Sequence, residues 1–211
     1  MVDAMAGRVL KALDEAQMTD NTLVIFSSDN GPTWYPEDVK RFHHDSAGGW
    51  RGMKADAWEA GHRVPFLVRW PNVVSPGTVS DQTICFTDVL ATFAAITGYD
   101  LQPEDGPDSF DFSPILRGEA DAERGRPCLL VQSGGGFMTV RQDGWKLIEG
   151  LGSGGFSDPK RIRPEPGGPT GQLYNLKEDP AEQQDLFTAE PQKVEELRQL
   201  WHSIRDAGRH R

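Results

Sequence analysis

The spacing of apolar residues changes from helical to strand-like within the first 28 positions. Between residues 2 and 17 apolar side chains recur every three or four positions, which predicts an amphipathic helix. After a turn at Asp20-Asn21 comes an almost continuous β-branched and aromatic run at 22–28, typical of a strand buried on both faces. Helix, short turn and buried strand make half of an α/β unit, so this region predicts a parallel sheet.

A long polar segment separates this strand from the next. Residues 29–62 are polar and rich in Gly without a sustained period, and they predict a loop. Loops of that length in compact domains usually carry function or are disordered. The apolar run at 64–70 predicts a second buried strand. Thr87 is a fair N-cap for a helix over 88–96, which Gly98 ends.

Beyond about residue 120 the elements become short. Strands and a closing helix are predicted, in chain order, at 127–131, 137–141, 145–148, 172–176 and 194–204. Gln142-Asp143-Gly144 is a good hairpin turn between two of these strands. The Gly/Pro/Ser-rich segment 150–171 has few apolar residues, and we expect it to be mobile.

These patterns predict an α/β protein in two parts. Residues 1–120 would form part of a doubly wound, mixed or parallel sheet with helices. Residues 121–211 would form a small C-terminal subdomain, made of an antiparallel sheet and a helix.

Composition and charge narrow the possible partners. The formal net charge of −10 argues against nucleic acid, which is bound by clustered Lys and Arg. No apolar run approaches the roughly 20 residues of a membrane span, and Met1 does not open a secretory signal. The two cysteines, Cys85 and Cys128, follow no metal or redox spacing, so we expect buried, reduced thiols. They do not define a cellular compartment.

Side chains suited to metal binding stand directly after the first predicted strand. Ser28-Asp29-Asn30-Gly31 places a carboxylate and an amide oxygen at the carboxyl end of a central strand. Ligands bind at this edge of open α/β sheets. Such oxygen donors suit a hard cation, Ca²⁺ or Mg²⁺, which needs several further ligands. Taken alone, Asp-Asn-Gly also describes an ordinary turn, and the local pattern leaves both interpretations open.

Three ordered motifs resemble segments of the sulfatase family, within the alkaline-phosphatase superfamily. Residues 21–31 resemble the segment in which Asp and Asn complete the metal site. Arg51-Gly52-Met53-Lys54, followed by residues 58–65, is similar to the family's arginine-glycine-x-lysine and glutamate-glycine-glycine stretch. In the tail, residues 172–176 and 178–182 are similar to its closing leucine-tyrosine-aspartate-leucine and aspartate-proline-x-glutamate element. The resemblance covers nearly the whole chain.

The resemblance implies roles for individual residues. Asp29 and Asn30 would be metal ligands, with Ca²⁺ favoured over Mg²⁺. Lys54 would contact the sulfate group of a sulfate-ester substrate, where a compact ammonium neutralises charge that builds on the sulfuryl oxygens. The family's nucleophile is a formylglycine hydrate, made from a cysteine or serine in a cysteine-x-proline-x-arginine motif. Family members are often exported.

Other loop residues admit two interpretations each. His44 either points into the substrate pocket or is a solvated loop histidine beside His43. Arg51 either contacts substrate or pairs with Glu59 to brace the loop, and bracing is favoured. We therefore take Lys54 and His44 as candidate catalytic residues and, with Arg51, as candidate substrate-binding residues.

The sequence departs from the family at the nucleophile, because neither Cys85 nor Cys128 stands in a cysteine-x-proline-x-arginine motif. The expectation is a C-terminal sulfatase fragment that lacks the nucleophile half and is inactive alone. Its partners would be the sulfate ester, the missing N-terminal half in cis or in trans, or further copies of itself. The alternative is a non-catalytic remnant that binds an anion or a partner.

Overall fold

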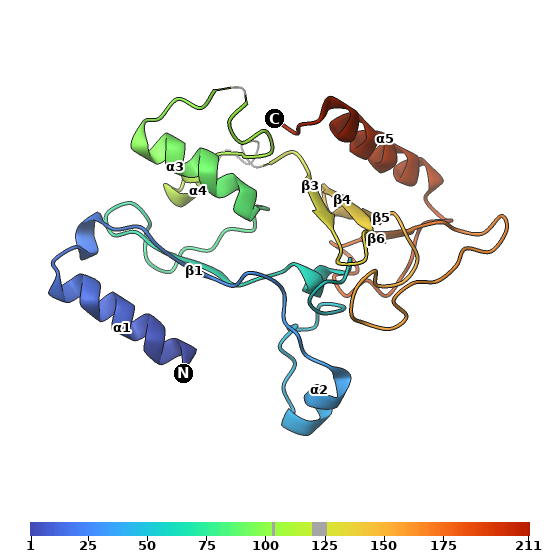
Figure 1. Ribbon diagram of the computed structural model, residues 1–211, viewed down its shortest axis with the longest axis horizontal. Coiled ribbons are helices and arrows are strands. Elements are labelled where there is room, and N and C mark those ends of the chain that lie inside the picture. The colour runs from blue at the N-terminus through green and yellow to red at the C-terminus, as the bar shows by residue number, and fades with distance from the viewer. Residues whose placement is uncertain (103, 120–125) are drawn as a thin grey trace. The chain divides into compact units, whose positions relative to one another are not determined.

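The chain divides into two compact units that are not continuous in sequence. The computed structural model describes residues 1–102, 104–119 and 126–211. The first unit comprises residues 1–27 and 65–125, and the second comprises 28–64 and 126–211 (Figure 1). The predicted boundary at 120/121 falls outside the described ranges. The long loop over 28–64 belongs with the C-terminal part of the chain, not with the strands on either side of it.

In the first unit, the two predicted strands pair with each other. Helix α1 (Val2–Glu15) and a 3₁₀ turn, η1 (Thr19–Asn21), precede β1 (Val24–Ser27), which pairs with β2 (Phe66–Arg69). The pairing is antiparallel, whereas the sequence predicted a mixed or parallel sheet. The cause is the long excursion between the strands, which returns the chain to the end of β1 that it left. Ser27 accordingly lies opposite Phe66.

A helical layer completes the first unit. It consists of η3 (Phe86–Asp88), α3 (Val89–Thr97) and the single turn α4 (Ser113–Leu116). Gly98 ends α3 in the left-handed conformation, as predicted, with a φ of 71°. The predicted N-cap Thr87 does not cap this region. Asp88 stands at the N-cap of α3, and its buried carboxylate accepts a hydrogen bond from the Cys85 N–H at 2.7 Å in the capping box of η3.

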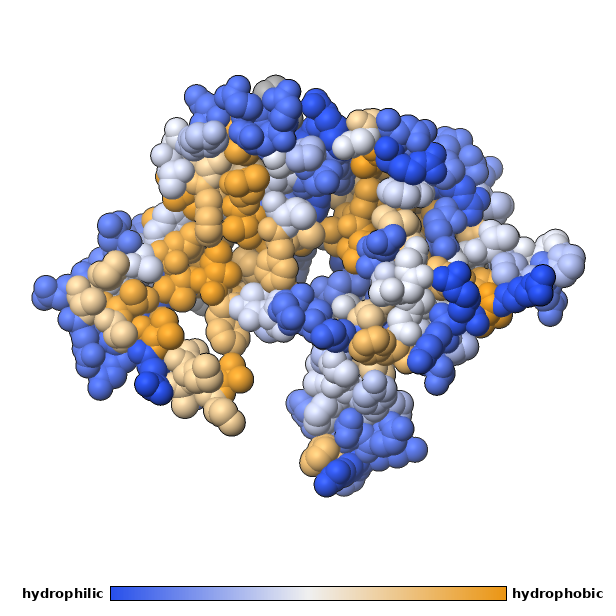
Figure 2. All heavy atoms as spheres, in the orientation of Figure 1, coloured by the Kyte–Doolittle hydropathy of each residue, from blue (hydrophilic) through white to orange (hydrophobic). Residues whose placement is uncertain are grey.

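Much apolar surface of the first unit stays exposed. Phe26 of β1 and Leu67 of β2 are 40% and 58% exposed, so these strands are not buried on both faces as predicted. Side chains alternate along a strand, and only one face of this pair is covered. Figure 2 shows apolar residues gathered over α3 and the strand pair. Further large apolar side chains are exposed on the helices α1 and α3: Val2, Met5, Val9, Leu90 and Phe93.

The second unit is built on an antiparallel sheet with a helix against it. Its strands, in sheet order, are β3 (Leu129–Gln132), β4 (Met138–Gln142), β5 (Trp145–Ile148) and β6 (Gln172–Asn175). The predicted hairpin between β4 and β5 is confirmed, with Asp143 and Gly144 at φ values of 51° and 88°. Helix α5 (Pro191–Ala207) packs on the sheet through a cluster of buried apolar residues: Val140, Leu147, Leu173, Val194 and Leu197.

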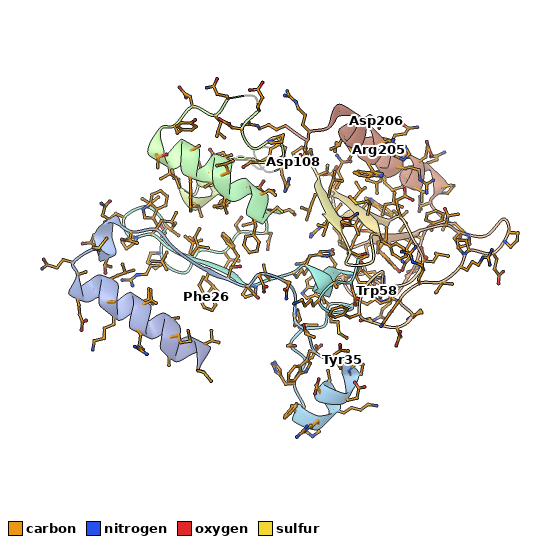
Figure 3. The ribbon with its side chains drawn as sticks, viewed as in Figure 1. Phe26, Tyr35, Trp58, Asp108, Arg205 and Asp206 are labelled. Carbon is orange, nitrogen blue, oxygen red and sulfur yellow. The ribbon has the colours of Figure 1, made fainter. Side chains whose placement is uncertain are left out.

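The long loop packs into this second unit and carries two short elements, α2 (Pro36–Phe42) and η2 (Glu59–Gly61). Trp58, beside η2 in Figure 3, is buried in a core cluster with residues of the sheet. The segment 150–171, predicted to be mobile, packs against the same loop. Its buried Ser153 accepts a hydrogen bond from the Ala57 N–H at 2.7 Å. None of the helices in the described part of the chain has the length and hydropathy for crossing a bilayer.

Candidate active site

The Asp29-Asn30 pair follows β1, as the sequence predicted. Gly31 fixes its place, because a Cβ on Gly31 would lie only 1.8 Å from the carbonyl oxygen of Ala60. The Asn30 amide group donates to the Gly31 carbonyl at 2.9 Å, which leaves the amide oxygen for another partner. Asp29 is exposed, and no residue in the described ranges donates a hydrogen bond to its carboxylate. The pair thus presents two oxygen donors.

Lys54 lies at the corner of a tight turn. The Asp56 N–H donates to the Met53 carbonyl at 3.0 Å across this turn, and Ala55 adopts a left-handed φ of 72°. The Asp56 carboxylate accepts the Met53 N–H at 2.9 Å and locks the turn from inside. Gly52, at a φ of 88°, is required because a Cβ there would lie 2.7 Å from that carboxylate.

A backbone hydrogen bond joins the turn that carries Lys54 to the segment that carries the Asp29-Asn30 pair. The Lys54 N–H donates to the carbonyl of Pro32 at 2.7 Å, two residues beyond Asn30. The Lys54 side chain is half-buried, and within the described residues its ammonium has no hydrogen-bond or ion-pair partner. The turn that carries this unpaired cation is therefore joined through its backbone to the segment that carries the two oxygen donors.

His44 is not joined to this group. It follows α2, its side chain is exposed, and its ring meets the Trp34 ring edge-on with centroids 5.9 Å apart. The Trp34 indole N–H donates to the His44 carbonyl at 2.7 Å, which ties the end of the helix down. These contacts are those of a surface loop histidine, and its predicted catalytic and substrate-binding roles stay predictions.

Arg51 braces the loop, but not through Glu59 as predicted. Its guanidinium lies 3.7 Å from the centre of the Trp58 ring and donates to the Tyr174 hydroxyl at 3.1 Å and the Glu182 carbonyl at 2.7 Å. It also borders a cavity of about 440 Å³ lined by Gly49, Arg51, Ala181, Glu182 and Gln183. The brace therefore runs from the loop to the tail of the chain.

Glu59 instead belongs to a buried charged cluster that sequence reasoning missed. Its carboxylate lies 3.0 Å from the Lys146 ammonium, 2.7 Å from the Arg63 guanidinium and 3.3 Å from that of Arg141. Lys146 also lies 2.9 Å from Glu182 Oε1, and Glu182 Oε2 accepts the Glu59 N–H at 2.7 Å. The side chains of Glu59, Lys146 and Glu182 are all at most 1% exposed.

Burial and the neighbouring cations together shift the pKa values of the groups in this cluster. Burial acts to raise the pKa of the Glu59 carboxyl, but Lys146, Arg141 and Arg63 outweigh it and lower that pKa to about 2. Burial and the neighbouring Lys146 lower the pKa of His62 to about 3, so its imidazole is neutral at pH 7. Burial raises the pKa of Glu182, against the effect of Lys146.

Asp29 and Asn30 are oxygen ligands of the kind that a hard cation binds, but two ligands are too few to hold it. Asp29 and Asn30 offer a carboxylate and an amide oxygen, whereas Ca²⁺ takes about 6–8 oxygen ligands. Across the described residues no group of three or more His, Cys, Asp or Glu side chains is arranged for a metal. Two acids of the same loop already have partners: the Asp45 carboxylate accepts two loop N–H groups, and Asp56 accepts from Met53, Phe156 and Ser157.

Comparison with known proteins identifies the family of the chain. Residues 1–99 match the family model described as Sulfatase. The chain is 33% identical to the N-acetylgalactosamine-6-O-sulfatase of Bacteroides thetaiotaomicron, over 97% of this chain and 40% of that protein. It is 42% identical to mouse steryl-sulfatase over a shorter alignment, 56% of this chain and 19% of that protein. The chain belongs to the sulfatase family.

Solved structures agree with this assignment. A Bacteroides thetaiotaomicron structure, from work on the metabolism of multiple glycosaminoglycans, matches with a TM-score of 0.80 and 32% identity, over 96% of this chain and 42% of that one. A Pseudoalteromonas sulfatase matches with a TM-score of 0.72 at 24% identity, over 96% and 40%, which is a likeness of fold. The fold is the α/β fold of sulfatases. The aligned region spans 40% of the N-acetylgalactosamine-6-O-sulfatase and 19% of the mouse steryl-sulfatase.

Proposed function

We propose that this chain supplies metal ligands and the sulfate-binding lysine of a sulfuric-ester hydrolase. The observation that carries the proposal is the hydrogen bond from the Lys54 N–H to the Pro32 carbonyl, 2.7 Å long. It joins the turn that bears an unpaired ammonium to the segment that bears the Asp29-Asn30 oxygen donors. A sulfate ester needs both, because it carries a negative charge and its sulfuryl oxygens gain more as the ester bond breaks.

Each residue would have a separate task. Asp29 and Asn30 would hold a divalent cation, for which we propose Ca²⁺, as two of its oxygen ligands. A cation bound there supplies Lewis-acid polarisation of the sulfate oxygens. Lys54 would bind a sulfate oxygen and stabilise the charge that accumulates in the transition state, where a fixed cation is worth more than in the ground state.

The nucleophile would have to come from polypeptide other than these 211 residues, which contain no cysteine-x-proline-x-arginine motif. We therefore propose that the chain alone does not turn over sulfate esters. The substrate is proposed only as a class, because the relatives are named for different sulfated compounds, such as an N-acetylgalactosamine 6-O-sulfate group and a steryl sulfate.

The first test is genetic. The DNA upstream of the Met1 codon is read for an in-frame cysteine-x-proline-x-arginine segment, whose presence is the expected result. The polypeptide that includes this segment is then assayed with a chromogenic aryl sulfate in Ca²⁺, beside the 211-residue chain. Turnover by the longer polypeptide alone supports the proposal. Turnover by the short chain, or a start at Met1 without such a neighbour, contradicts it and favours an anion- or partner-binding module.

The second test replaces the lysine in the active polypeptide. Lys54→Ala should lower kcat by about 10² to 10³, the usual scale for removing one electrostatic stabiliser. Lys54→Arg should restore only part of this, because a planar guanidinium does not replace a compact ammonium. The control is Lys177→Ala, at an exposed lysine after β6. The assignment of Lys54 is wrong if Lys54→Ala keeps kcat within about twofold of this control.

A further inference from the structure

The buried charged cluster is connected to the candidate active site through one short turn. Its centre is Glu59, the first residue of η2, and the same short turn ends at Gly61. Gly31, next to the oxygen donors, packs on this turn so closely that a Cβ would lie 1.8 Å from the Ala60 oxygen. The Ala60 N–H donates to the Arg51 carbonyl at 2.9 Å, which closes the loop that carries Lys54. One turn therefore supports both halves of the site.

The tail of the chain determines where this turn lies. Glu182 holds it at two points: Oε2 accepts the Glu59 N–H at 2.7 Å, and the Glu182 carbonyl accepts from Arg51 at 2.7 Å. Lys146 of β5 bridges the Glu59 and Glu182 carboxylates at 3.0 and 2.9 Å. In the described residues, the ion pair with Lys146 is the one interaction of Glu182 Oε1, which accepts no hydrogen bond from another group.

Two features show that this connection is specific. Glu182 has a φ of 53°, a left-handed backbone that is costly for a residue with a side chain, so the surrounding contacts must impose it. Lys146, Glu59 and Glu182 are buried, and buried ion pairs are weak devices for stability compared with apolar packing. These buried charges are therefore better explained by a role in fixing the position of the turn than by a contribution to the stability of the fold.

We propose that Glu182 and Lys146 are positioning residues, which fix Lys54 relative to the Asp29-Asn30 pair through the turn at Glu59. This inference rests on the proposed function for its catalytic consequence, but not for its structural one. The structural consequence is that loss of Glu182 loosens a loop more than one hundred residues away in sequence, whether or not the chain is catalytic.

Amide hydrogen exchange on the 211-residue chain, followed by NMR, measures this directly. The readout is the exchange rate of the Lys54 N–H divided by that of the Val140 N–H, which lies in the sheet. Glu182→Ala removes the acceptor of the Glu59 N–H and should raise this ratio at least tenfold. The matched control is Val194→Ala, on α5, which weakens the packing against the sheet without touching the turn and should leave the ratio within twofold or lower it.

A conservative variant covers the case in which Glu182→Ala does not fold. Glu182→Gln keeps an oxygen for the Glu59 N–H but loses the charge that faces Lys146, and should raise the ratio at least threefold. A ratio within twofold of wild type in every folded Glu182 variant overturns the proposal. So does an equal rise in Val194→Ala, since any weakening of the unit would then produce the effect.

The catalytic arm uses the active polypeptide of the preceding section. Misplacement of Lys54 should lower kcat in Glu182→Gln by about 10- to 100-fold with KM within threefold, because small displacements in a site are costly. Val194→Ala, assayed well below its melting temperature, should keep kcat within twofold. A raised exchange ratio with unchanged kcat overturns the positioning role. Absence of turnover in wild type refutes the proposed function, while the exchange ratio still decides the structural part.

Discussion

Replacing Lys146 by Met tests the buried cluster through the stability of the fold. Met keeps the length and apolar stem of the lysine, so the change removes the ammonium without opening a cavity. Glu59 retains Arg63 and Arg141, whereas Glu182 keeps only the Glu59 N–H within the described residues. Breaking a buried ion pair by removing one partner costs about 3–5 kcal/mol.

Because Glu59 keeps two cations, we expect the lower end of this range, about 3 kcal/mol. With a denaturant slope of about 2 kcal/mol per molar urea, the unfolding midpoint should fall by about 1.5 M. The measurement is urea unfolding at pH 7 followed by tryptophan fluorescence. Lys177→Met, at an exposed position, is the control and should stay within about 0.5 kcal/mol of wild type.

A double variant separates the lost charge from lost packing. In Lys146→Met with Glu182→Gln no unpaired carboxylate stays buried at position 182, so we expect at least about 1 kcal/mol of the loss to be recovered. A Lys146→Met chain within 1 kcal/mol of Lys177→Met would refute the reasoning. A double variant less stable than Lys146→Met would refute it as well, because the carboxylate would then not be the source of the penalty.

Three further predictions concern the 211-residue chain. The free energy of unfolding should fall as pH drops below about 6.5, by up to about 1.4 kcal/mol per pH unit, because His62 has a pKa of about 3 when folded and binds its proton only on unfolding. Glu59, whose pKa is lowered to about 2, should cause a second fall in the free energy of unfolding below pH 4.5. When the stability of His62→Gln is measured against pH, the first fall should be absent and the second should remain. In thermal melts, Ca²⁺ should raise the melting temperature by less than about 2 °C, because Asp29 and Asn30 are only two ligands. A larger shift that persists in Asp29→Ala would mean that Ca²⁺ binds to other residues. Light scattering should show self-association that Leu67→Glu reduces, since Leu67 is 58% exposed on an uncovered strand pair; a monodisperse wild-type monomer would contradict this.

The elements of the fold could be predicted because local patterns determine them. The apolar spacing of residues 2–17, the run at 22–28 and the Gly98 stop each correspond to an observed element. Strand direction could not be predicted in this way, because it depends on where a long excursion returns the chain. The chain comes back to the end of β1 that it left, where the Ser27 hydroxyl donates to the Pro65 carbonyl at 2.6 Å, and β2 therefore pairs antiparallel with β1.

For a similar reason, the sequence predicted some residues of the candidate site but not the contacts that hold them. Asp29, Asn30 and Lys54 stand in motifs of fixed spacing, so their residues could be named, and the structure joins their segments. Their roles stay predictions. The partners of Arg51 and Glu59 in the sheet and the tail lie more than eighty positions away, and no local pattern reports contacts of that range. The sequence did contain one clue to these long-range contacts, because the tail motif at 178–182 ends on Glu182.

These long-range contacts give the C-terminal subdomain a role in supporting the loop that carries Lys54. A loop built from Gly-rich sequence has no core of its own, and a charged side chain that binds an anion must be held still to contribute fully. In this chain the holding groups are Lys146 on the sheet and Glu182 in the tail, both with buried side chains. The tail is therefore part of the scaffold of the site, and a chain cut before β3 would keep Lys54 while losing the contacts that place it.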